Sequence, residues 1–195
     1  MAKIVNGRRA RRWDVRDWAE GALARARTPQ SAQGLLAIYL NDHLAGATGG
    51  VELARRVAAW YPVPGQQAAL EGLAADIAQD RQTLLDLMTT LGMPVRRYKV
   101  GVAWAAEKAG RLKLNGSLLT RSPLSNLEEL EMLRLGVEGK AAGWRTLREL
   151  AKTDGRLRPG TLDELTSRAR EQASLLEELR VQAAAQLVGA QPAGS

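Results

Sequence analysis

The chain has 195 residues, no cysteine and no phenylalanine, and its 28 lysines and arginines outnumber 21 aspartates and glutamates to give a formal net charge of +7. This length supports one domain with a substantial core, and the lack of cysteine excludes a disulfide framework and a thiolate metal site, which fits a reducing cytoplasm. No uncharged stretch is long enough to predict a membrane span.

Residues 1–28 are predicted to form a basic arm, because eight of their side chains are Lys or Arg against three Asp or Glu. No apolar core follows the first basic residues, so we expect no secretory signal. Asp14 is a candidate cap for a short helix that carries Trp18. The arm either packs this helix on the rest of the chain with its arginines in water, or binds nucleic acid through phosphate contacts. The clustered arginines are Arg8, Arg9, Arg11 and Arg12.

The first long helix is predicted over residues 29–61, with Thr28 as its N-cap and Pro29 at its first position. Its centre is almost free of side chains, since Gly46 and Gly50 lie there, and this predicts that another backbone comes close. The residues expected to share its buried face are Leu36, Leu40, His43, Ala47, Gly50, Ala54, Val57 and Tyr61.

A second long helix is predicted over residues 64–91, ended by Gly92 in the left-handed conformation and by Pro94. Residues 95–121 then read as a crossover that contains a shorter amphipathic helix. The buried face of the second helix is predicted to consist of Leu70, Leu73, Ile77, Asp80, Leu84, Met88 and Leu91.

The third and fourth long helices are predicted over residues 123–153 and 162–188, and residues 189–195 are expected to be a disordered tail. Each helix has a capping box near its start, formed by Ser125 with Glu128 and by Thr161 with Glu164. The third buried face is predicted as Leu127, Leu130, Arg134, Val137, Ala141, Trp144, Leu147 and Ala151. The fourth is predicted as Leu162, Leu165, Ala169, Gln172, Leu176, Leu179, Ala183 and Leu187.

Two antiparallel helix pairs joined by a long connection predict an all-α fold, namely an antiparallel four-helix bundle with one long crossover. In helix number, helix length and crossover the chain resembles the ferritin-like superfamily over roughly residues 29–188. The segments YLNDHLAGATGGVELARR and LRLGVEGKAAGWRTL are similar to uncharacterised bacterial proteins of this kind. An alanine- and arginine-rich composition also suggests a bacterial genome rich in G and C.

The resemblance implies a test for a di-iron centre, which needs one Glu from each of two helices and a Glu-x-x-His pair from each of the other two. The chain contains one histidine, His43, and the matching places on the second and fourth helices read Asp76-x-x-Gln79 and Glu171-x-x-Ser174. We therefore expect neither the usual di-iron chemistry nor another cofactor.

A polar layer is predicted at the middle of the bundle. Counted from the two short turns, His43 and Asp80 fall at similar heights on the first pair, and Arg134 or Glu138 matches Gln172 on the second. The layer is interpreted as a hydrogen-bonded network that fixes helix register, because buried polar groups without partners are costly. The alternative is a divergent metal or ligand site that uses His43, Glu52, Asp80 and Glu138.

The leading hypothesis is a non-catalytic, metal-free, cytoplasmic bundle that serves as a structural or protein-interaction module. The sequence contains neither a phosphate-binding glycine loop nor a G-x-S-x-G element, so neither motif supports an enzyme. The tryptophans in the long helices are expected to pack in the core or at an interface, and Trp60 is a candidate for a subunit contact. We expect a homo-oligomer, most simply a dimer. A metal or ligand site and a nucleic-acid-binding arm remain the two alternatives.

Overall fold

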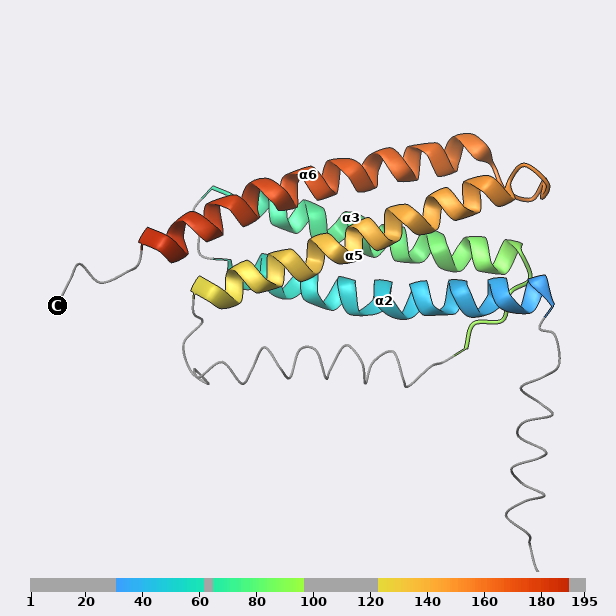
Figure 1. Ribbon diagram of the computed structural model, residues 1–195, viewed down its shortest axis with the longest axis horizontal. Coiled ribbons are helices and arrows are strands. Elements are labelled where there is room, and N and C mark those ends of the chain that lie inside the picture. Colours follow the sequence, from blue (N-terminus) through green and yellow to red (C-terminus); the bar gives the residue numbers. More distant parts are fainter. Residues whose placement is uncertain (1–30, 62–64, 97–122, 190–195) are drawn as a thin grey trace, which may run out of the picture. The chain divides into compact units, whose positions relative to one another are not determined.

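A computed structural model of the chain describes residues 31–61, 65–96 and 123–189. The chain divides after Leu35 into two compact units, and the second unit holds all four helices apart from the first residues of α2. The helices are α2 (Ala32–Trp60), α3 (Gln67–Thr90), α5 (Pro123–Leu150) and α6 (Pro159–Gly189), which lie side by side in Figure 1. These ranges contain no strand, so the all-α class is confirmed. The arginine cluster, the crossover helix and the tail lie outside the described residues.

Three helices begin at residues other than those predicted, and one of them, α3, begins at Gln67, three residues after its predicted start. Helix α2 begins after Ser31, whose hydroxyl accepts the Gly34 N–H at 3.1 Å, so Ser31 and not Thr28 is its N-cap. Helix α6 begins at Pro159, three residues before the predicted start. Proline suits the first position of a helix because its fixed φ is already helical. An N–H at this position would have no acceptor within the helix, so proline loses no hydrogen bond there.

The end of α3 agrees with its prediction. Gly92 has a φ of +68°, in the left-handed region that favours glycine. Its N–H donates to the Thr89 carbonyl at 3.0 Å, and the next N–H, of Met93, donates to the Met88 carbonyl at 2.8 Å. These two bonds form a Schellman motif, which satisfies carbonyls that the end of a helix would otherwise leave without donors.

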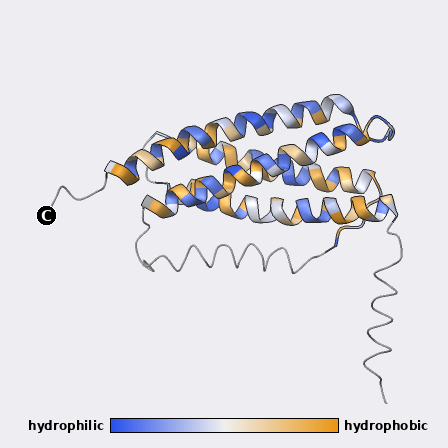
Figure 2. Ribbon diagram, in the orientation of Figure 1, coloured by the Kyte–Doolittle hydropathy of each residue, from blue (hydrophilic) through white to orange (hydrophobic). Residues whose placement is uncertain are grey.

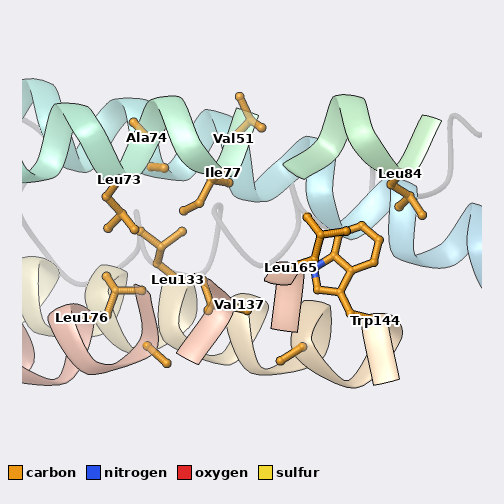
Figure 3. Packing of buried hydrophobic residues seen from close by; sticks show 14 of the residues in the cluster. Val51, Leu73, Ala74, Ile77, Leu84, Leu133, Val137, Trp144, Leu165 and Leu176 are labelled. Carbon is orange, nitrogen blue, oxygen red and sulfur yellow. The ribbon is translucent and has the colours of Figure 1, made fainter. Parts of the chain in front are cut away.

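The core is built from the inner faces of the four amphipathic helices, along which hydrophobic and hydrophilic residues alternate in Figure 2. In Figure 3, Leu73 of α3 points toward Leu133 of α5 and Leu176 of α6, all of which are buried. All seven residues predicted for the inner face of α3 are buried. On α6 seven of the predicted eight are buried and Leu187 is partly exposed.

The inner face of α2 differs from its prediction at the middle of the helix. Leu44 and Val51 are buried there in place of His43 and Gly50, which are only partly covered. A run of alanine and glycine carries too little side chain to mark one face of a helix, so the spacing leaves the rotation of this part of α2 open. A Cβ built on Gly46 or Gly50 meets no heavy atom of the described residues within 4 Å, so none of these residues makes the predicted backbone approach.

Side-chain hydrogen bonds link α2 to α3 at two heights. The Arg81 Nε donates to the Thr48 hydroxyl at 2.9 Å, and the Gln67 amide donates to the Ala58 carbonyl at 2.6 Å. Thr48 therefore lies opposite Arg81, and Ala58 lies opposite Gln67.

Within the described ranges, no helix combines the length and the apolar character that crossing a membrane requires.

Candidate functional site

The most deeply buried charge in the described residues is the carboxylate of Asp80, at the middle of α3. Its side chain is 1% exposed. One carboxylate oxygen, Oδ1, accepts a hydrogen bond from Arg168 of α6, and the other, Oδ2, lies 2.5 Å from the Lys140 ammonium of α5. A buried carboxylate without such partners would cost several kcal/mol in lost hydration, about as much as removing one partner from a buried ion pair.

Lys140 reaches this carboxylate from the middle of α5. Its side chain is 13% exposed, and its ammonium also donates to the side-chain oxygen of Gln172. Burial lowers the pKa of Lys140, and the nearby Arg168 charge acts in the same direction, while Asp80 and the more distant Asp76 oppose the shift. The ammonium is thus held in an apolar interior chiefly by one carboxylate.

Gln172 connects the anion and the cation of this pair. Its amide nitrogen donates to Oδ2 of Asp80 at 3.2 Å, while its oxygen accepts from Lys140. A side-chain amide can do both at once because it carries a donor and an acceptor. Gln172 is 4% exposed, so both of its polar ends need partners inside the protein.

Arg168 completes the group, one helical turn before Gln172 on the same face of α6. Its side chain is 35% exposed, which keeps part of the guanidinium in contact with solvent. The Nε of Arg168 is buried and has no hydrogen-bond partner among the described residues. We call Asp80, Lys140, Arg168 and Gln172 the ionic layer; it ties α3, α5 and α6 together, and its two cations and one anion leave a formal charge of +1.

His43 lies apart from the ionic layer, on α2. Its ring makes an edge contact with Tyr39, with 4.4 Å between ring centroids. Its Nδ1 and Cε1 lie 3.2 Å from the place that a Cβ on Gly143 of α5 would occupy. Burial lowers the pKa of His43, and the neighbouring Asp42 opposes this shift. Among the described residues, no hydrogen bond or ion pair joins His43 to Asp80.

The other predicted members of the polar layer also lie elsewhere. The Nε of Arg134 is 3.4 Å from a carboxylate oxygen of Glu177 at the α5–α6 seam. Glu138 is exposed, and Glu52 pairs with Arg55 at 3.1 Å on the surface of α2. Of the five residues predicted to form the layer, the structure brings together Asp80 and Gln172. The turns predicted similar heights for His43 and Asp80, whereas the contact of Arg81 with Thr48 places Asp80 nearer the level of residue 49. The rotation of each helix about its axis was not predictable from the turns.

Sequence reasoning missed two of the four residues of the ionic layer, Lys140 and Arg168. A signal for both exists in their spacing. Lys140 follows Val137 by three residues and precedes Trp144 by four, so it shares their buried face, and Arg168 precedes Gln172 by four. Since a buried aspartate requires a partner such as a cation, the predicted burial of Asp80 implies a cation on one of the facing helices.

The residues that could ligate a metal do not gather in the described part of the chain. No group there contains three His, Asp or Glu side chains placed to hold an ion. The carboxylate of Asp80 is already surrounded by the chain's own donors.

No family model, no curated protein and no solved structure matches this chain.

Proposed function

We propose that the chain is a non-catalytic structural or protein-interaction module, built as a ferritin-like four-helix bundle. The observation that carries this proposal is that both oxygens of the buried Asp80 carboxylate are engaged by Lys140, Arg168 and Gln172. The buried anion at the middle of the helices is therefore paired with side chains of the chain itself. Such a network gives helices a defined register, which is the best-attested role of buried polar groups.

The antiparallel arrangement within this proposal is supported by the contacts between α2 and α3. Thr48 lies opposite Arg81, and Ala58 lies opposite Gln67, so residue numbers rise along one helix as they fall along the other. The same pattern relates α5 to α6, where Arg148 near the end of α5 pairs with Asp163 near the start of α6 at 3.0 Å.

The long crossover is supported by a contact at the other end of α3. Arg156, in the turn after α5, donates to the Leu91 carbonyl at the end of α3, at 3.2 Å. The ends of α3 and α5 therefore meet, and the start of α5 lies about 40 Å away, since α5 has 28 residues. The described residues Arg96 and Pro123 therefore lie toward opposite ends of α5, which supports a bundle with one long crossover.

A site for a metal ion is disfavoured by the chemistry of the layer. An ion bound to Asp80 would have to displace Lys140 or Arg168, or would stand beside these two cations. Neither cation can act as a ligand while protonated, because ammonium and guanidinium groups have no acceptor. We therefore favour the structural hypothesis over a divergent metal site.

Metal analysis of the full chain, purified without chelators, tests this proposal. We expect far less than one iron, manganese or zinc ion per chain, with no change in the Asp80→Asn variant. A stoichiometric metal that is lost in Asp80→Asn but kept in the matched surface variant Asp163→Asn would overturn the proposal in favour of a metal site. For the interaction role, we propose a second copy of the chain as the first partner to consider.

A further inference from the structure

The outer side of the α2–α3 pair carries a shallow groove whose floor is alanine. Ala58 and Ala59 of α2 line it together with Ala74, Ala75 and Ala78 of α3. The groove continues past Ala78 toward Thr48 and Arg81. Because alanine adds one carbon beyond the backbone, another helix can approach such a surface more closely than one covered by long side chains.

The walls of the groove carry opposite charges at matching heights. Arg55 stands on the α2 wall and Glu71 on the α3 wall, and both side chains are exposed. Ala58 lies opposite Gln67. Arg55 precedes Ala58 by three residues and Glu71 follows Gln67 by four, so the two charges stand almost level across the groove.

Charge across the whole groove is balanced as well. Its charged lining consists of two glutamates and two arginines, namely Glu52, Arg55, Glu71 and Arg81. A surface with this balance does not select a strongly acidic or a strongly basic partner. It instead matches a copy of itself, provided that a symmetry operation places Arg55 of each copy over Glu71 of the other.

We propose that the α2–α3 groove is the dimer interface of this chain, with the two-fold axis running parallel to the helices. Such an axis lays α2 of one copy over α3 of the other at the same height. Each Arg55 then meets Glu71 of the other copy, and the two alanine floors face each other. This inference deepens the proposed function, on which it rests, by naming both the partner and the surface that binds it.

Sedimentation velocity on the full chain, from micromolar to submillimolar concentration, tests the interface. We expect a concentration-dependent dimer. Ala75→Arg, which places a long cation on the floor of the groove, should weaken dimerisation by about tenfold or more. Ala185→Arg is the matched control, since Ala185 is also an exposed helical alanine but lies on α6, outside the groove. Circular dichroism should show unchanged helix content in both variants.

A charge swap tests the pairing itself. Arg55→Glu should weaken the dimer, and the double variant with Glu71→Arg should restore it, because the swap exchanges the two signs without changing their number. A monomer at every concentration would overturn the inference and leave the module proposal to its metal test. A dimer that Ala75→Arg leaves intact, or a weakened dimer that the double variant does not restore, would show that another surface is used and would also overturn it.

Discussion

The ammonium of Lys140 on α5 lies 2.5 Å from a carboxylate oxygen of Asp80 on α3, so the two helices are joined by an ion pair between side chains that are both largely excluded from solvent. Each charge in such a pair has given up its hydration, and each depends on the other for compensation. Removing one partner and replacing both partners should therefore have very different effects on stability.

Asp80→Leu should lower the free energy of unfolding by about 3 kcal/mol, because it leaves Lys140 and Arg168 without their shared anion. The double variant Asp80→Leu/Lys140→Met should recover part of this loss, since it replaces the buried pair with apolar side chains of similar size and leaves only the partly exposed Arg168 without its anion. Urea unfolding followed by circular dichroism measures both. A loss below about 1 kcal/mol in the single variant would contradict the role that we assign to the ionic layer.

Replacing Gly139 or Gly143 of α5 by alanine should have different effects on stability. A Cβ on Gly139 has no heavy atom of the described residues within 4 Å, so Gly139→Ala should stabilise the chain by up to about 1 kcal/mol through helix propensity alone. A Cβ on Gly143 would lie 3.2 Å from two atoms of the His43 ring, closer than ordinary van der Waals contact. Gly143→Ala should therefore be at least about 1 kcal/mol less stable than Gly139→Ala in thermal or urea unfolding.

Equal stability of the two alanine variants would mean that the His43 ring moves aside at no cost. The double variant Gly143→Ala/His43→Ala, compared with His43→Ala alone, shows whether the His43 ring causes the difference. Removing the ring should bring the effect of an alanine at 143 close to that of one at 139, because the atoms that it would meet are gone.

The fold was more predictable from the sequence than the site, for a physical reason. Bulky apolar residues such as Leu70 and Leu176 identify a buried face by their size, so the faces of α3 and α6 were predictable. The glycine-rich middle of α2 lacks that signal. Lys140 is a long cation of a kind that usually reaches solvent, so its spacing alone did not distinguish a buried ammonium from an exposed one.

A second buried polar residue that the spacing did not indicate is Asn41 of α2. Its amide donates to the Pro94 carbonyl at 2.9 Å and to the Ala37 carbonyl at 2.7 Å, while its oxygen accepts the Arg96 N–H at 2.7 Å. Asn41→Ala should cost about 1–3 kcal/mol, because these backbone groups lose their partner in a partly buried place.

Hydrogen exchange measured by mass spectrometry gives a more specific test of Asn41. The Asn41→Ala variant should lose protection in the peptide that contains Arg96, while peptides from α6 keep theirs. Uniform loss of protection over the whole chain would indicate that Asn41 acts on global stability and not on this segment. The exposed neighbour Asp42→Ala serves as the control.

His43 should make the chain less stable in mild acid. Because burial lowers its pKa below the usual 6.5, the unfolded chain binds a proton that the folded chain resists as the pH falls through that value. Stability should therefore decrease from pH 7.5 toward pH 5.5, and the difference between the native chain and His43→Gln should shift in favour of the variant. Urea titrations of both proteins at several pH values measure this shift, and parallel pH profiles would exclude a role for His43.

The turn after α5 offers a titration that can be measured at one residue. The guanidinium of Arg156 donates to both carboxylate oxygens of Asp154, at 2.9 and 2.6 Å, and its backbone N–H donates to one of them. These bonds lower the pKa of Asp154 to about 2, so the ionised form persists in acid. Stability that depends on this carboxylate is present above the unfolded pKa of 3.8 and is lost as the pH falls toward 2. Carbon-detected NMR should follow the titration of Asp154 directly, and Arg156→Gln should raise its pKa toward 3.8. If the pKa of Asp154 stays near 2 in Arg156→Gln, the backbone N–H of residue 156 alone lowers it, and the guanidinium does not. The same variant also removes the hydrogen bond to the Leu91 carbonyl.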